Sequence, residues 1–106
     1  MYKIMNNMGI NLTEQELEVA TNMLKAIAHP QRLAIINLLE NGKNLNVTEI
    51  YTALNIEQSV ASHHLGILKD KGIVSAKRMG KNTLYSLRHE QLNALISCIK
   101  TCAKTK

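Results

Sequence analysis

The sequence predicts a mainly α-helical domain that carries one β-hairpin near its C-terminal end. Apolar residues recur every three or four positions from Leu17 to Leu68, as they do in amphipathic helices. Between residues 73 and 87 the apolar period shortens to two, which is typical of half-buried strands, and from Glu90 the helical period returns. The order helix, helix, helix, short turn, helix, hairpin, helix predicts a winged helix-turn-helix with an extra helix at each end.

Short motifs mark where the helices begin. Thr13 and Glu16 form a capping-box pattern before the first helix, and Asn46 and Glu49 repeat this pattern before the third. Pro30 suits the first position of the second helix, because proline presets the backbone angle there and loses no hydrogen bond. These signals divide the N-terminal half of the chain into three helices.

Length and composition limit the classes of protein. The 106 residues suit one domain, which we place at residues 13–106, after a polar arm of residues 1–12 that has no clear hydrophobic period and is expected to be flexible. The chain has no glycine-rich phosphate loop and no nucleophile elbow, so an enzyme is not expected. It also lacks a membrane-spanning apolar run and a secretory signal, which predicts a cytoplasmic protein with no membrane partner.

A helix-turn-helix is predicted from Val47 to Lys71. The first helix covers residues 47–54, and after a three-residue turn the second covers residues 58–71, with its apolar seam inward. The second helix of such a pair enters a DNA major groove, where short polar side chains contact base edges and phosphates. A solvated helix face is the alternative interpretation. The outward positions are Gln58, Ser59, Val60, Ser62 and His63.

Basic residues gather around the predicted hairpin. Two alternating runs, residues 73–78 and 82–87, flank Met79, Gly80 and Lys81, which predicts a hairpin with glycine at its tip. Five of the 13 basic residues fall between positions 69 and 81. Basic side chains on a two-stranded ribbon suit phosphate or minor-groove contacts, whereas a merely solubilising hairpin is the alternative. The candidate DNA contacts here are Lys69, Lys77, Arg78 and Lys81.

Four sequence blocks carry a resemblance to a known family. They are Ala26-Ile27-Ala28-His29-Pro30-Gln31-Arg32-Leu33, Gln58-Ser59-Val60-Ala61-Ser62-His63-His64-Leu65, Leu68-Lys69-Asp70-Lys71-Gly72-Ile73-Val74 and Arg78-Met79-Gly80-Lys81-Asn82-Thr83-Leu84-Tyr85-Ser86-Leu87. In this order the chain resembles the ArsR/SmtB family of small bacterial winged-helix repressors, over about residues 13 to 103.

The resemblance implies a sequence-specific regulator of double-stranded DNA. It implies a homodimer built from the first and last helices, which docks two recognition helices and two wings on a palindromic operator, represses transcription and leaves the DNA when an inducer binds. The dimer interface is then expected at Leu17, Val19, Met23, Leu92, Leu95, Ile96 and Ile99.

The chain departs from the metal sites of that family. Where one family site has Cys-Val-Cys, this sequence has Asn46-Val47-Thr48, which supplies no thiolate. The positions that match a second family site are His89, Gln91, Cys102 and Thr105, of which two can bind a metal. No metal cofactor is therefore expected, and the inducer is unidentified.

Two cysteines remain on the predicted last helix. Cys98 and Cys102 are four residues apart, so their thiols share one face beside the expected dimer seam. One hypothesis is a thiol sensor, or a soft-metal site completed by the cysteines of the second subunit. The alternative is that both cysteines fill the dimer interface as small buried apolar residues.

The histidines carry separate expectations. His29 precedes a helix and is expected to cap or pack, His64 lies beside the buried seam and is expected to be hydrogen-bonded, and His89 is expected to cap or be solvated. His63 faces outward with the other polar residues of the recognition helix. A winged helix that binds protein instead of DNA is the remaining alternative, but it would present an apolar recognition face.

Overall fold

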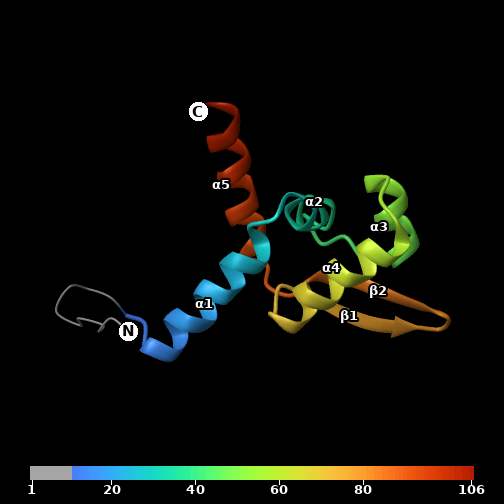
Figure 1. Ribbon diagram of the computed structural model, residues 1–106, viewed down its shortest axis with the longest axis horizontal. Helices are drawn as coiled ribbons and strands as arrows, with labels where there is room; N and C mark the ends of the chain where they lie inside the picture. Colours follow the sequence, from blue (N-terminus) through green and yellow to red (C-terminus); the bar gives the residue numbers. More distant parts are fainter. Residues whose placement is uncertain (1–10) are drawn as a thin grey trace.

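The computed structural model describes residues 11–106, so the predicted arm of residues 1–12 lies almost wholly outside it. The architecture is the expected winged helix-turn-helix with a helix added at each end (Figure 1). The helices α1 and α5 project on the side opposite the hairpin tip, and the described chain measures 50 × 34 × 23 Å. The elements are α1 (Glu14–Ile27), α2 (Pro30–Leu38), α3 (Val47–Leu54), α4 (Gln58–Asp70), β1 (Val74–Met79), β2 (Asn82–Leu87) and α5 (Leu92–Lys104).

The helix starts are those that the capping motifs predict. The Thr13 hydroxyl accepts from the Glu16 amide at 3.0 Å while the Glu16 carboxylate accepts from the Thr13 amide at 2.9 Å. Asn46 and Glu49 form the same reciprocal pair at the start of α3. His29 caps α2, because its Nδ1 accepts from the Gln31 amide at 3.2 Å. Each pair satisfies amide groups that the first turn of a helix leaves without partners.

The hydrophobic core joins the three central helices to the base of the hairpin. The inward seam of α4, which includes Leu65 and Leu68, is fully buried, as its spacing predicts. It belongs to one cluster with side chains from α2, α3 and the base of β1. Packing against α2, α3 and the base of β1 fixes the position of α4. The other fully buried large side chains are Ile35, Ile36, Leu39, Ile50, Ile73, Val74 and Ile96.

The hairpin has a tighter turn than the sequence predicts. β1 pairs antiparallel with β2 from Val74 opposite Leu87 to Met79 opposite Asn82, so the turn holds two residues and Met79 belongs to the strand. Gly80 adopts φ +61°, which favours glycine because a side chain would be strained there.

A third segment is paired with the outer edge of β2. The Leu45 amide donates to the Tyr85 carbonyl at 3.0 Å, and the Tyr85 amide donates to the Leu45 carbonyl at 2.7 Å. Leu45 directly precedes the capping residue of α3. The hairpin is therefore bonded to the entry of the helix-turn-helix as well as to the end of α4.

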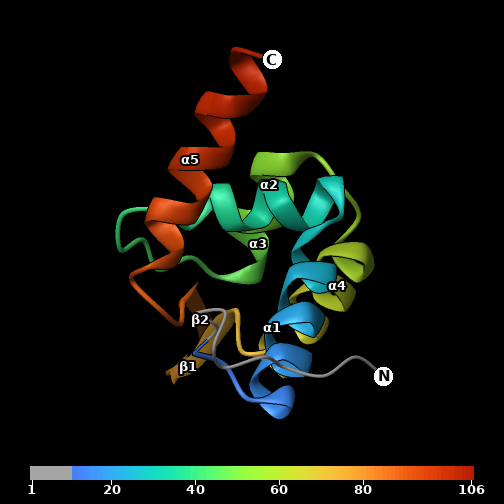
Figure 2. The same ribbon diagram turned by 90° about the vertical axis from the view of Figure 1, so that its left-hand side faces the viewer.

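The last helix stands beside α2 in both views (Figures 1 and 2). It begins at Leu92, two residues after the predicted start, because the preceding residues form tight turns in which the Leu92 amide donates to the His89 carbonyl. Lys100 reaches the carboxylate of Glu40 at 2.9 Å, where only 8% of Glu40 is exposed. Among residues 11–106, no helix combines the length and the apolar character that a membrane span needs.

The cap of α3 can be tested by stability. Asn46→Ala should lower the free energy of unfolding by about 1 kcal/mol, because the Glu49 amide in the first turn loses its side-chain acceptor. Urea unfolding followed by circular dichroism measures this change. Thr48→Ala, at an exposed position in the same turn, is the matched control and should not be destabilised. Equal loss in both variants would contradict the role of the cap.

Candidate nucleic-acid interface

A sharp turn holds α3 and α4 at a fixed angle. Asn55 ends α3 in the left-handed conformation, with φ +53°, which asparagine tolerates better than most residues. The Ile56 amide then donates to the Tyr51 carbonyl at 3.1 Å, and Glu57 opens α4 without a side-chain cap. The turn therefore keeps α3 and α4 as one helix-turn-helix unit.

The outward residues of α4 lie where the sequence places them. Gln58, Ser59, Ser62 and His63 are exposed, while Val60 is half-buried. The exposed set offers amide, hydroxyl and imidazole groups, which donate and accept hydrogen bonds. Such groups suit the base edges of a major groove better than an apolar protein surface.

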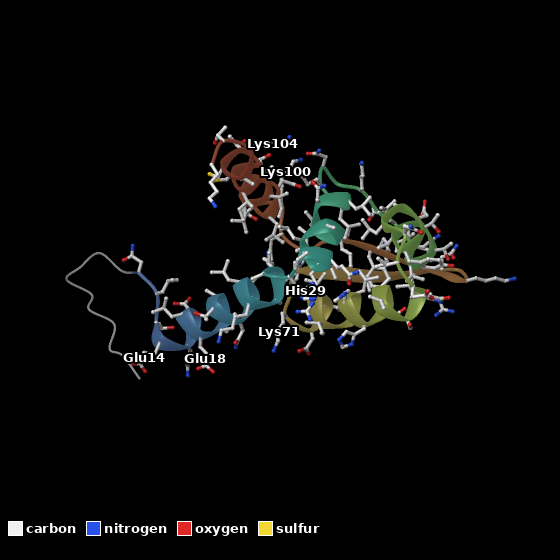
Figure 3. The ribbon with its side chains drawn as sticks, turned by 45° about the horizontal axis from the view of Figure 1, so that its top comes forward. Glu14, Glu18, His29, Lys71, Lys100 and Lys104 are labelled. Atoms are coloured by element: carbon white, nitrogen blue, oxygen red, sulfur yellow. The ribbon has the colours of Figure 1, made fainter. Side chains whose placement is uncertain are left out.

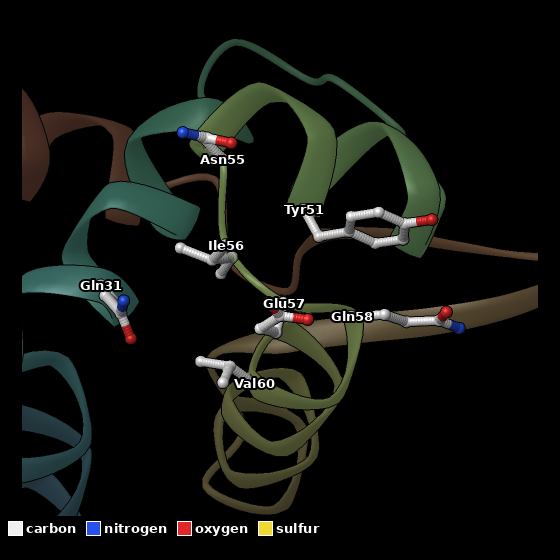
Figure 4. Close-up of a pocket in the computed structure, with 7 residues that line it drawn as sticks. All are labelled: Gln31, Tyr51, Asn55, Ile56, Glu57, Gln58 and Val60. Atoms are coloured by element: carbon white, nitrogen blue, oxygen red, sulfur yellow. The ribbon is translucent and has the colours of Figure 1, made fainter.

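Val60 lines an open cavity between the turn and α2 (Figure 4). Gln31 of α2 and Tyr51 of α3 line the same cavity, and the side chains of Tyr51 and Gln58 extend in the same direction. The spacing of α3 does not point to Tyr51, although it is one of three aromatic residues in the chain. Its polar tip beside the start of α4 is the signal that marks it as an additional candidate for DNA contact.

The positively charged tip of the hairpin is the second half of the candidate site. Lys77, Arg78 and Lys81, which we call the basic wing, are all exposed. The Arg78 Nε donates to the Gly80 carbonyl at 2.9 Å, so this side chain folds along the turn. Lys69 is exposed near the end of α4, and the nearby acid Asp70 pairs with Lys71 at 3.7 Å.

The two histidines of α4 have opposite environments. His63 is exposed on the outward face, whereas His64 is buried, with 5% exposure, and bonded to α2. Burial lowers the pKa of His64 below its ordinary value of 6.5, and His29, Arg32 and His63 lower it further. His64 therefore belongs to the support of α4 and not to its outer surface.

The expected dimer face is only partly at the surface. Val19 is 58% exposed and Ile99 is 37% exposed, so both are free to contact a second copy. Leu17, Met23 and Leu95 are half-buried. A correction concerns Leu92 and Ile96, which pack inside the protomer's own core with 7% and 1% exposure. They face inward because α5 uses this side to cover the core, and they support the face instead of forming it.

The two thiols of α5 are at the surface of the protomer. Cys98 and Cys102 are both free and exposed, so neither fills the protomer's core. Within residues 11–106, no three His, Cys, Asp or Glu side chains come together as a metal site. A soft metal ion bound to both thiols would therefore need further ligands, such as those of a second subunit.

The fold and the site together define a winged-helix protein of the DNA-binding class. A sequence model described as "Bacterial regulatory protein, arsR family" matches residues 29–76. The HTH-type transcriptional regulator YgaV of Escherichia coli K12 is 32% identical over 83 residues, which is 78% of this chain and 84% of YgaV. The transcriptional repressor PagR of Bacillus anthracis is 36% identical over 83 residues, which is 78% of this chain and 83% of PagR.

Solved structures agree with this assignment. HlyU from Vibrio cholerae N16961 superposes with a TM-score of 0.76 at 29% identity, covering 85% of this chain and 97% of HlyU. The homodimeric winged helix-turn-helix domain of Mb0332 from Mycobacterium bovis superposes with a TM-score of 0.77 at 29% identity, covering 89% of each chain. The chain belongs to the ArsR family, as the sequence blocks predict.

Proposed function

We propose that this chain is a cytoplasmic repressor that binds a palindromic DNA operator as a homodimer. One observation carries the proposal: the outward face of α4 is exposed and polar, and α4 ends directly against the strand that leads to the basic wing. The Ile73 amide donates to the Leu68 carbonyl at 2.8 Å at this junction. Base contact and phosphate contact are thus offered by adjoining elements.

The two parts of the site would have different tasks. Ser59, Ser62 and His63 would contact base edges in the major groove, with Gln58 and Val60 beside them. The basic wing and Lys69 would hold phosphates or the minor groove, which strengthens binding to any duplex. Polar groups on α4 favour this proposal over a protein-binding winged helix, and family membership favours it over an enzyme.

Dimer formation would bring two such sites together. The exposed apolar residues Val19, Leu24 and Ile99 lie on α1 and α5, the two helices that project from the body (Figure 1). The similar Mb0332 domain is homodimeric, which supports the same assembly here. A two-fold axis would then set half-sites about one helical turn apart, roughly 34 Å.

Paired variants separate base contact from phosphate contact. Ser62→Ala combined with His63→Ala should remove most of the preference for a duplex selected from a random pool over a shuffled duplex. Arg78→Ala should instead weaken binding to both duplexes and reduce the slope of log K against log salt by about 1. Fluorescence anisotropy at several salt concentrations measures both effects. Full discrimination by the double variant would contradict the assignment of α4.

A single substitution that introduces a negative charge tests whether Val19 lies in the dimer interface. Val19→Asp should shift the protein towards the monomer, with an apparent dissociation constant raised about 100-fold, because the interface would bury an unpaired carboxylate. Sedimentation equilibrium measures the constant. Thr21→Asp is the matched control, exposed on α1 outside the groove that Val19 lines. An unchanged dimer in Val19→Asp would place the interface elsewhere.

The exposed thiols make a soft-metal or thiol-responsive repressor the second candidate. Their exposure in the protomer leaves both thiols free to meet a metal ion, an oxidant or a second subunit, and packing in the dimer interface as small apolar groups is the alternative. A soft metal ion would displace the thiol protons and join the two subunits through their α5 helices.

A ligand panel tests this candidate. Soft metal ions and thiol oxidants should release DNA from the wild-type protein but not from Cys98→Ser combined with Cys102→Ser, as followed by anisotropy. Ser at both positions keeps the size of the side chain while removing the soft ligand. Identical responses of the two proteins would exclude the cysteines as the residues that sense the metal ion or the oxidant.

A further inference from the structure

The buried side of the recognition helix is bonded to α2 through one imidazole. The Nδ1 atom of His64 accepts a hydrogen bond from Arg32 Nε at 3.1 Å, and its Nε2 lies 2.8 Å from Gln31 Oε1. Since Nδ1 accepts, Nε2 carries the proton and donates to the amide oxygen. Within residues 11–106, these are the only side-chain hydrogen bonds that join α4 to another element. We call Gln31, Arg32 and His64 the α2–α4 latch.

Arg32 extends the latch to the end of α1. Its Nη1 atom is 3.4 Å from the Ala26 carbonyl, while the two ion pairs within the described residues involve other side chains. The guanidinium therefore rests on neutral acceptors, one of which is an imidazole. Figure 3 shows His29 at the junction of α1 and α2, close to α4, and its ring centroid is 4.7 Å from that of His64.

We propose that the α2–α4 latch positions the recognition helix for sequence-specific DNA binding, and that it closes only while the imidazole of His64 is neutral. The proposal rests on the DNA-binding function proposed above. It assigns a positioning role to Gln31, Arg32 and His64, which lie behind the outward face of α4.

Protonation removes the acceptor on which the latch depends. A neutral imidazole has one acceptor and one donor, and the latch uses both. The cation would carry a second N–H, on Nδ1, that points at the N–H of Arg32. The hydrogen bond from Arg32 would then be lost, and two positively charged groups would face each other. The titratable or charged groups around His64 are His29 and Arg32 on the α2 side and His63 on α4, and none of them is acidic.

The sign of the pH effect follows from the lowered pKa of His64. Burial, His29, Arg32 and His63 all disfavour the charged form, so the folded protein takes up this proton less readily than the unfolded chain. The stability that the latch contributes is therefore complete above pH 6.5 and is lost as the pH falls from 6.5 through the folded-state pKa.

Acid should weaken specific binding more than nonspecific binding. Opening of the latch would misplace the outward face of α4 and weaken binding to the preferred sequence. Attraction of the basic wing to the phosphates of any duplex does not depend on the placement of this face, so binding to a nonspecific duplex should weaken less. The informative quantity is therefore the ratio of the two affinities, not either affinity alone.

The experiment measures this ratio by fluorescence anisotropy. The specific probe is the duplex that the wild-type dimer selects from a random pool at about pH 8, and the nonspecific probe is its shuffled sequence. The affinity ratio of the wild-type protein should fall at least about tenfold between about pH 8 and about pH 5. Circular dichroism at each pH confirms that the protein stays folded.

Two substitutions at one position distinguish positioning from packing. His64→Leu should lower the ratio at least about tenfold at about pH 8, because the half-buried Arg32 and Gln31 lose their partner. His64→Gln, whose amide both donates and accepts without titrating, should restore most of that loss and show little change of the ratio with pH.

Two further substitutions serve as controls at His29 and His89. His29→Asn keeps a side chain that can cap α2 but removes the imidazole that lies beside His64, and should retain a fall of the ratio in acid. His89→Gln, at an exposed position outside the latch, should follow the wild-type profile.

Several outcomes would overturn the proposal. A pH-independent ratio in the wild-type protein, or the same fall of the ratio in His64→Gln, would remove the role of protonation. Full discrimination by His64→Leu would remove the positioning role. If His64→Leu does not fold, two measurements still test the proposal: the pH profile of His64→Gln and nitrogen NMR of the wild-type imidazole. The NMR experiment is informative because the latch requires an unprotonated Nδ1 above pH 6.5.

The failure of the proposed function has a different signature. If the wild-type protein binds no duplex at any pH while NMR shows the expected imidazole, DNA binding fails and the latch geometry stands. If the duplexes are bound and discriminated without any dependence on His64, DNA binding stands and the latch proposal fails.

Discussion

The burial of one face of α4 is the constraint on which the rest of the structure depends. Leu65 and Leu68 are almost or fully inaccessible to solvent, and burial of each such side chain contributes about 1.5–3 kcal/mol. Ile36 and Ile50 meet them from α2 and α3 in the same core. Because this seam is held, the opposite face of the helix has a defined orientation. The polar residues on that outward face take no part in the packing of the core and stay exposed.

Much of the architecture could be predicted because its signals are local. The capping boxes at Thr13 and Asn46 and the seam of α4 depend on residues a few positions apart, and the structure confirms them. Contacts between distant segments leave weaker signals in one sequence. The pairing of Leu45 with Tyr85 and the bond of Arg32 to His64 span 40 and 32 residues, and no spacing rule reveals either.

The face of α5 shows why a helical period alone does not assign a partner. Leu92, Leu95, Ile96 and Ile99 share the same apolar stripe in the sequence. The structure divides that stripe between the protomer's core, which takes Leu92 and Ile96, and the surface, where Ile99 remains. Amphipathic spacing indicates that one face of a helix is buried. The exposure of each side chain in the protomer then shows whether the protomer's own core already buries it.

The Leu45–Tyr85 pairing joins the helix-turn-helix and the hairpin into one structural unit. One backbone bridge connects the entry of α3 to β2, while the chain itself connects α4 to β1. The distance between the helix proposed to contact the bases and the hairpin proposed to contact the phosphates is thereby set within the protein. A duplex would have to adjust its own groove width or curvature to engage both at once. Nucleotides that the protein never touches would then influence affinity through their stiffness.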